Sequence, residues 1–156
     1  MEDKEKDLNS VTHTEIRFFT PRFYPFDSFS AYTVELWGKK FPTVEHAYQW
    51  KKYELSNPAL AQQIFDAPNP NAVKKISDAH KDQVSSVWDE QKVSVMEEIL
   101  KAKTAQHEKV RSLLVESGTR TIVENSPTDG FWGIGPDGNG QNMLGTLWMK
   151  VRDELK

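Results

Sequence analysis

Two Asn-Pro pairs, Asn57-Pro58 and Asn69-Pro70, constrain the fold of this chain more than any other feature of the sequence. An asparagine side chain can cap the first turn of a helix. Proline suits the first helical position because its φ is already helical and it lacks an N–H that would need a partner. The two pairs therefore predict helices over Pro58 to Asp66 and over Pro70 to His80.

Hydrophobic spacing and turn residues predict the other elements. We expect helices from Thr43 to Leu55, Val87 to Ala105, Glu108 to Ser117 and Met143 to Leu155, and strands at Glu15–Phe19, Ala31–Trp37, Lys40–Phe41 and Thr119–Glu124. A turn at Gly38-Lys39 would join two of these strands into a hairpin. The result is a mostly helical α+β domain with a small β-sheet, covering residues 15–156. The charged residues 1–14 would form a flexible tail.

Composition excludes several classes of function. The chain has 156 residues and no cysteine, so it has no disulfide, no thiolate metal site and no cysteine nucleophile. Its four histidines form no paired zinc motif, and we expect neither a metal nor another cofactor. The net charge of −3 does not favour nucleic acid as the main partner, although a local basic pocket remains possible. No apolar run is long enough to cross a membrane, and the lack of cysteine suits the cytoplasm.

The segment FPTVEHAYQW, Phe41 to Trp50, places a carboxylate among residues of core type. Glu45, Gln49 and Lys52 share one face of the predicted helix, because they are spaced i, i+4 and i+7. Glu45 lies in the first turn, where the helix dipole favours an ionised carboxylate. It is a candidate catalytic residue. The alternative is that Glu45 only offsets the dipole at the surface and His46 packs beside Trp50.

A second candidate segment is ENSPTDGFWGIG, Glu124 to Gly135, which begins a stretch rich in glycine. Asp129 and Glu124 are candidate carboxylates, and the ring of Trp132 could stack on a planar base. Gly133 would let the backbone approach a ligand closely. The alternative is a connection in which Trp132 fills the core. On the preceding strand, Arg120 would point to the same side as Glu124.

Lys103 follows the apolar stripe at the end of the long helix. A lysine in this position commonly interacts with the helix C-terminus. The alternative is a partly buried amine, which can form a Schiff base with an aldehyde or ketone.

The combined motifs resemble the NADAR family, the YbiA-like N-glycosidases, over about Arg17 to Leu155. The matching segments are FSAY from Phe29, FPTVEHAYQ from Phe41, VM..IL.AK..QH from Val95, SGTRTIVENSPTDGFWGIG from Ser117 and GQNMLGTLWMKVRDEL from Gly140. The family commonly has F-S-N-F at the first of these segments, where this chain has Ala31-Tyr32 in place of the last two residues. The resemblance implies a YbiA-like fold.

The resemblance also implies hydrolysis of an N-glycosidic bond. Relatives cleave phosphoribosylamino-pyrimidine intermediates of riboflavin synthesis, and others remove ADP-ribose from guanine in DNA. The expected substrate is a small phosphoribosyl heterocycle. The alternatives are an ADP-ribosylated nucleic acid, or binding of an ADP-ribose-type nucleotide without catalysis. Oligomeric state is not predicted.

These implications assign roles to the candidate residues. Glu45 and Asp129 would form the catalytic pair, with Glu124 in reserve and Lys103 as the nucleophile of an imine route. Substrate would be held by Trp132 as a stacking surface, with further contacts from Gly133, Gln49, His46, Arg17, Lys52, Arg120 and Asn142. Of these, His46 would orient Glu45, and the three basic residues would bind phosphate.

Overall fold

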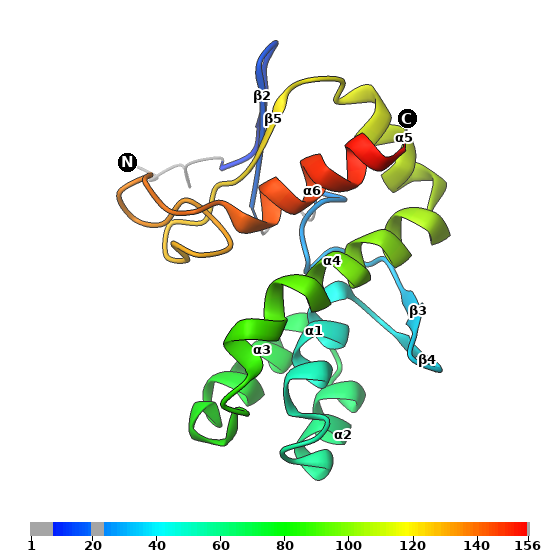
Figure 1. Cartoon of the computed structure of the whole chain (residues 1–156), viewed down its shortest axis with the longest axis vertical. Helices are drawn as coiled ribbons and strands as arrows, with labels where there is room; N and C mark the ends of the chain where they lie inside the picture. Colours follow the sequence, from blue (N-terminus) through cyan, green and yellow to red (C-terminus); the bar gives the residue numbers. More distant parts are fainter. Residues whose placement is uncertain (1–7, 20–23, 156) are drawn as a thin grey trace, which may run out of the picture. The chain divides into compact units, whose positions relative to one another are not determined.

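Helices begin where the sequence provides capping side chains. A computed structural model describes residues 8–19 and 24–155 of the chain (Figure 1). Asn57 accepts a hydrogen bond from the Leu60 N–H, and helix α2 follows at Pro58–Asp66. Asn69 caps α3, Pro70–Asp78, in the same way. Both predicted helix starts are therefore confirmed, although α3 ends at Asp78 and not at His80.

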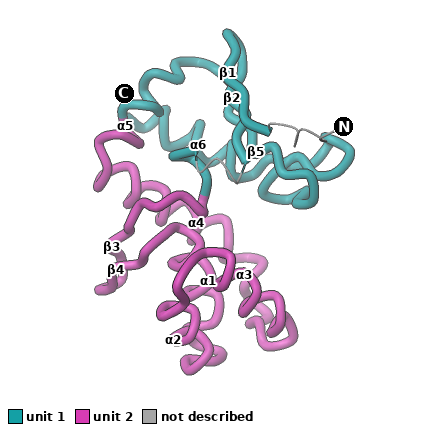
Figure 2. Tube along the Cα trace, turned by 180° about the vertical axis from the view of Figure 1, so that it is seen from behind, with its two compact units in different colours: residues 1–27, 112–156 teal, residues 28–111 magenta. Residues whose placement is uncertain are grey.

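The described residues divide into two compact units (Figure 2). Unit 1 contains described residues of 1–27 and 112–156, and unit 2 contains residues 28–111. One boundary lies between Asp27 and Ser28, and the other falls within α5, Glu108–Glu116. The fold class is α+β, as predicted from the sequence.

Unit 1 is a three-stranded sheet with a helix packed against it. The strands are β1 at Ser10–Val11, β2 at Glu15–Phe18 and β5 at Thr121–Glu124. β2 lies between an antiparallel β1 and a parallel β5, and helix α6, Met143–Glu154, packs against β5. The prediction of a tail through residue 14 was wrong for Ser10–Val11, which pair with β2, and residues 1–7 lie outside the described residues.

The core of unit 1 is aromatic. Trp148 of α6 is fully buried, and its ring centroid lies 5.0 Å from that of Phe26. The Trp148 indole N–H also donates to the Phe26 carbonyl over 3.0 Å. Phe18 of β2 meets Phe26 edge-on, so the sheet, the following segment and α6 share one buried cluster.

Unit 2 contains a hairpin and helices α1 to α4. The hairpin strands are β3, Val34–Leu36, and β4, Lys39–Phe41. Its turn lies at Trp37-Gly38, one residue before the predicted position, because both residues have positive φ values of 53° and 74°. The helices are α1 at Val44–Tyr53, α2, α3, and α4 at Trp88–Gln106, and a 3₁₀ turn at Lys81–Gln83 precedes α4.

Asn142 fastens α6 to the edge of β5. It has a left-handed backbone with φ of 49°. Its side-chain oxygen accepts from the Glu124 N–H, and its amide nitrogen donates to the Ile122 carbonyl, both over 2.9 Å. A Cβ on Gly145 would lie 2.0 Å from the same carbonyl, so only glycine allows the helix to approach this closely.

This arrangement predicts that Asn142→Ala destabilises the protein. The substitution leaves one backbone donor and one acceptor of β5 without their partner, which costs about 1–3 kcal/mol each when such groups are buried. Urea unfolding monitored by tryptophan fluorescence measures the loss. Asn139→Ala, at an exposed loop position, is the control and should change stability by less than about 0.5 kcal/mol. Equal stability of the two variants would contradict the assigned role.

Candidate active site

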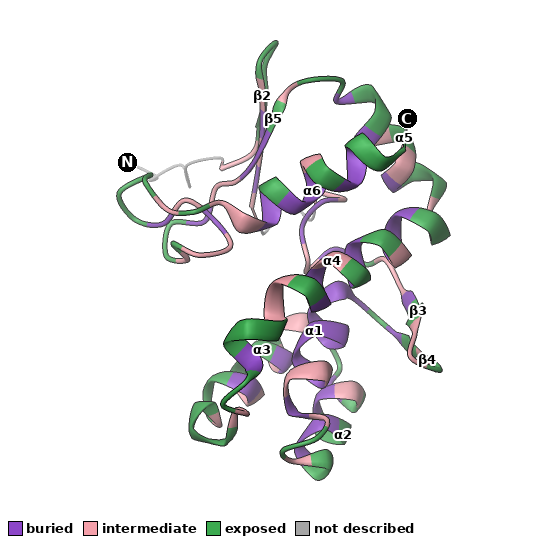
Figure 3. Ribbon diagram, viewed as in Figure 1, coloured by how far each residue is buried: buried purple, intermediate pink, exposed green. Residues whose placement is uncertain are grey.

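Glu45 is a buried carboxylate in the first turn of α1. Only 9% of the residue is exposed, and most of α1 is buried along its length (Figure 3). Thr43 caps the helix, and the Glu45 N–H donates to the Ser28 carbonyl over 3.1 Å. The helix dipole favours a negative charge here. The alternative in which Glu45 sits at the surface was therefore wrong.

The amide of Gln49 connects Glu45 to helix α3. Gln49 Nε2 donates to Glu45 Oε1 over 2.9 Å, and Ser77 Oγ donates to Gln49 Oε1 over 2.7 Å. All three residues are buried. Gln49 was predicted to contact substrate, and in the structure its amide faces Glu45 and Ser77.

Lys103 is a fully buried amine. It lies near the C-terminal end of α4 with 0% of the residue exposed. Its Nζ donates to Ser30 Oγ over 3.1 Å and lies 5.1 Å from the ring centroid of Tyr32. The structure therefore matches the buried-amine alternative, since a lysine that serves only the helix terminus would be expected in solvent.

The segment 28–32, which we call the FSAY loop, contacts both candidate catalytic residues of unit 2. Its Ser28 carbonyl receives the Glu45 N–H, and its Ser30 hydroxyl receives the Lys103 amine. Residues that are distant in sequence, on α1 and α4, are thus attached to one short loop. Ser30 was quoted in the sequence analysis only as part of a motif, and no role was predicted for it.

His46 does not orient Glu45, and this prediction was wrong. The imidazole is fully buried, with Nδ1 at 2.8 Å from Thr43 Oγ1 and Nε2 at 3.0 Å from the Ala67 carbonyl. Because a carbonyl can only accept, Nε2 carries the proton and Nδ1 accepts from the Thr43 hydroxyl. Burial lowers the pKa of His46 below its ordinary value, and the bond to Ala67 opposes this shift.

Lys52 is half-buried one turn beyond Gln49. Burial lowers the pKa of its ammonium group, and the negative charge of Glu45 opposes that shift. The ammonium also lies 5.7 Å from the ring centroid of Tyr53. The charge of Glu45 therefore acts on Lys52, which agrees with the predicted placement of both residues on one face of the helix.

In unit 1, Asp129 organises the glycine-rich loop. Its Oδ1 accepts the backbone N–H groups of Phe131 and Trp132, both over 2.9 Å. Trp132 is half-buried, and its ring meets that of Phe131 edge-on at 4.9 Å. Glu124 ends β5, and its Oε2 atom is buried. These contacts position the loop that carries Trp132.

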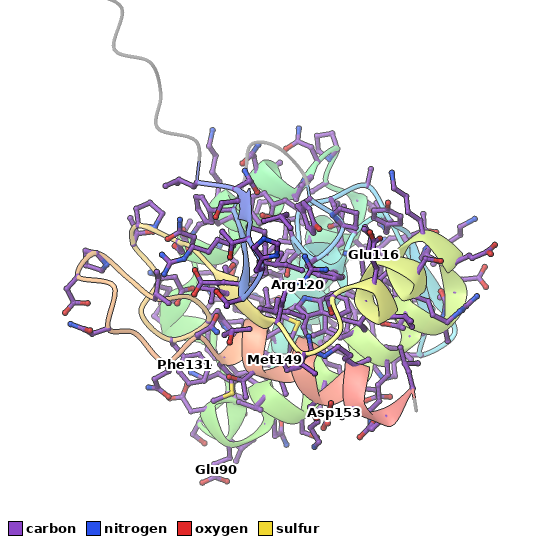
Figure 4. The ribbon with its side chains drawn as sticks, turned by 90° about the horizontal axis from the view of Figure 1, so that it is seen from above. Glu90, Glu116, Arg120, Phe131, Met149 and Asp153 are labelled. Carbon is purple, nitrogen blue, oxygen red and sulfur yellow. The ribbon has the colours of Figure 1, made fainter. Side chains whose placement is uncertain are left out.

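Backbone partners account for three other candidates in unit 1. A Cβ on Gly133 would lie 2.7 Å from the Glu124 carbonyl oxygen, so the glycine allows the loop to pack closely against the end of β5. Asn142 holds β5, as described above. Arg120 precedes β5, and its guanidinium donates to the carbonyls of Ser117 and Glu116 at the end of α5 (Figure 4 labels Glu116 and Arg120). These contacts give Asn142 and Arg120 structural roles, and their predicted substrate contacts stay predictions.

The guanidinium of Arg17 differs from that of Arg120 in its contacts. It forms an ion pair with Glu15 on the same strand, and its side chain is 39% exposed. An exposed ion pair of this kind contributes little to stability. The phosphate-binding role of Arg17 stays a prediction.

Comparison with known proteins identifies the family. The sequence matches the NADAR domain over residues 11–156. It is 34% identical to N-glycosidase Npun_R5314 of Nostoc punctiforme over 132 residues, 84% of this chain and 85% of that protein. This chain belongs to the NADAR family.

Two further relatives agree with this assignment. N-glycosidase YbiA of Escherichia coli is 31% identical over 130 residues, 83% of this chain and 80% of that protein. Its solution NMR structure covers 95% of this chain and is covered over 88% of its own length, with a TM-score of 0.81 and 29% identity. The chloroplastic riboflavin biosynthesis protein PYRR of Zea mays is 31% identical over 85% of this chain, which corresponds to 23% of that longer protein. This NADAR protein thus belongs to a family of hydrolases of N-glycosyl bonds.

The NADAR protein divides its candidate residues between the two units. Glu45, Gln49, Lys52 and Lys103 lie in unit 2, whereas Asp129, Trp132 and the other loop residues lie in unit 1. The pairing of Glu45 with Asp129 therefore stays a prediction. Among the described residues there is no cluster of three His, Cys, Asp or Glu side chains suited to a metal ion. Within the same residues, no helix has the length and apolar character of a membrane span.

Neutral His46 predicts a loss of stability in acid. Its pKa is lower in the folded state than the unfolded value of about 6.5, so the unfolded chain binds more protons below that pH. The contribution is present above about pH 6.5 and is lost as pH falls towards the folded-state pKa. His46→Gln should flatten the dependence of unfolding free energy on pH below about pH 6.5.

Urea unfolding at a series of pH values measures this slope. His13→Gln is the matched control, because His13 is exposed. The role assigned to His46 is contradicted if the two variants change the slope equally.

Proposed function

We propose that this protein hydrolyses the N-glycosidic bond of a phosphoribosylamino-pyrimidine intermediate of riboflavin synthesis, releasing the base and ribose 5-phosphate. The observation that carries the proposal is the joint attachment of buried Glu45 and buried Lys103 to the FSAY loop. The names of the bacterial N-glycosidases and of the maize riboflavin biosynthesis protein support the reaction and the substrate class. The partner is a small molecule in this proposal, and hydrolysis requires only water as co-reactant.

Glu45 suits a carboxylate route. The bond from C1′ to the base nitrogen breaks as C1′ gains positive charge and the nitrogen gains a proton. An ionised Glu45 beside C1′ stabilises that charge, and a second acid or base delivers the proton or activates water. Water then forms the new bond to C1′. The Gln49 amide and the helix terminus favour the ionised form of Glu45 that this role needs.

Lys103 suits an imine route. A ribosylamine can open to an imine at C1′, to which neutral Lys103 Nζ adds. The base leaves as its free amine, and the electron pair of the broken bond goes to its nitrogen with a proton. Water then hydrolyses the lysine imine and releases ribose 5-phosphate and the original amine. In this route Glu45 would move protons between the intermediates.

The remaining candidates serve binding. Trp132 is the proposed stacking surface for the pyrimidine, because its ring is half-buried on an ordered loop. Lys52 is the proposed phosphate ligand. A bound phosphate would favour the charged form of Lys52, against the effect of burial on its pKa.

The direct test is product analysis by mass spectrometry. Incubation with a ribosylaminopyrimidine phosphate should release free base and ribose 5-phosphate in equal amounts. An oligonucleotide carrying ADP-ribosyl-guanine is the comparison substrate and should be cleaved more slowly. Faster cleavage of the oligonucleotide would indicate that nucleic acid is the substrate. Binding of either compound without cleavage would contradict the proposed hydrolase activity.

Glu45→Gln should lower kcat/KM by about 10²–10⁴-fold with little change in fold. The substitution removes the charge but retains an oxygen that can accept from Gln49. Asp129→Asn also retains its acceptor for Phe131 and Trp132, so it isolates the charge from the loop structure. Steady-state kinetics with the pyrimidine substrate measures both. A fully active Glu45→Gln variant would remove Glu45 from the mechanism.

Borohydride trapping separates the two routes. If Lys103 forms the imine, reduction during turnover should leave a ribose 5-phosphate adduct on Lys103, detected by peptide mass spectrometry. Lys103→Met should lose both the adduct and the activity, while its unbranched side chain occupies a similar volume. An active wild type that yields no adduct would favour the carboxylate route.

A further inference from the structure

Ser77, which the sequence analysis did not single out, is buried and contacts the amide that holds Glu45. It lies near the end of α3 with 1% of the residue exposed. Its hydroxyl is 2.7 Å from Gln49 Oε1 and 3.3 Å from the hydroxyl oxygen of Tyr53. We propose that Ser77 is a positioning residue that fixes the orientation of the Gln49 amide, so that its NH₂ group faces Glu45.

The direction of each hydrogen bond follows from its acceptors. Tyr53 donates its only hydroxyl proton to backbone carbonyls, Ser77 at 2.9 Å and His80 at 3.3 Å. The Tyr53 hydroxyl therefore does not donate to Ser77 Oγ. The Ser77 proton goes to the nearer acceptor, Gln49 Oε1.

Gln49 then has one favourable orientation. Its amide oxygen and nitrogen have similar shapes, and a rotation of the amide plane would exchange them. With Oε1 held by Ser77, Nε2 donates to Glu45 Oε1 over 2.9 Å. The exchanged orientation would place an amide oxygen against the carboxylate and repel its negative charge. The Ser77 hydroxyl thus donates to Gln49, and the Gln49 amide donates to Glu45.

The hydrogen bonds from Ser77 to Gln49 and from Gln49 to Glu45 matter because they are buried. Glu45, Gln49 and Ser77 are each at least nine-tenths buried, so water replaces a lost contact poorly. Loss of the Ser77 hydroxyl would remove one of the two contacts that fix the Gln49 amide, so that Gln49 and Glu45 would be less firmly held. The inference rests on the proposed function, in which an ionised and fixed Glu45 acts at C1′.

Kinetics of four variants test the role. Ser77→Ala should lower kcat by about three- to tenfold, the equivalent of one hydrogen bond, with little change in KM. In a Gln49→Met background, Ser77→Ala should cause no further loss, because its effect passes through Gln49. Tyr53→Phe is the matched control, since it removes a buried hydroxyl from the same cluster but leaves the Ser77–Gln49 bond intact. It should retain wild-type kcat.

Side-chain amide NMR tests the geometry without any substrate. The Gln49 NH₂ signals are those that disappear in Gln49→Met. They should be ordered and slow to exchange in the wild type and in Tyr53→Phe, and should shift and exchange faster in Ser77→Ala. Mobile Gln49 signals in the wild type, or unchanged signals in Ser77→Ala, would overturn the inference even if Ser77→Ala lowers activity.

The two tests distinguish failure of this inference from failure of the proposed function. A wild type that cleaves no ribosylaminopyrimidine, with Gln49 signals as expected, refutes the function and leaves the positioning of Glu45 by Ser77 supported. An active wild type in which Ser77→Ala and Tyr53→Phe reduce kcat equally refutes the role of Ser77 and leaves the function intact. A loss caused by Ser77→Ala that persists in the Gln49→Met background has the same meaning.

Discussion

A carboxylate withdrawn from water must be stabilised by fixed dipoles, and the surroundings of Glu45 meet this requirement. The N-terminus of α1 supplies one dipole, and the Gln49 amide supplies another, held by Ser77 of α3. The Glu45 N–H in turn holds the FSAY loop, whose Ser30 reaches Lys103. The contacts around this buried carboxylate therefore link α1, α3 and the FSAY loop.

The parts of the fold that depend on local chemistry could be predicted from the sequence. The starts of α2 and α3 follow from Asn57 and Asn69, whose side chains bond backbone groups three residues away. The carboxylate on the buried helix was recognised for a similar reason, since its position in the first turn is itself local. The strand β1 was missed because its two exposed residues carry no periodic pattern.

The roles of Asn142, Gly133 and Arg120 could not be predicted in this way. The side chains of Asn142 and Arg120 form hydrogen bonds with backbone groups elsewhere in the fold. Gly133 lies so close to the backbone that a side chain would not fit there. A sequence names side chains but does not show which backbone groups will lie beside them. Polar residues and glycines near a suspected site were therefore assigned to a ligand. Ser77 was overlooked for the converse reason, because a serine within a helix carries no signal of the partner it will meet.

The family motifs contain two kinds of residue: those that contact the protein's own backbone, and those that contact other buried side chains. In the loop of unit 1, Asp129, Gly133 and Asn142 bond or accommodate the chain's own backbone, so the fold accounts for them whether or not they take part in catalysis. In unit 2, Glu45, Gln49 and Lys103 meet other side chains in a buried setting. Buried polar side chains of this kind are costly to keep for stability alone. A relative that retains the loop motif but replaces Glu45 and Lys103 by apolar residues would therefore keep the fold and lose the chemistry proposed for this site.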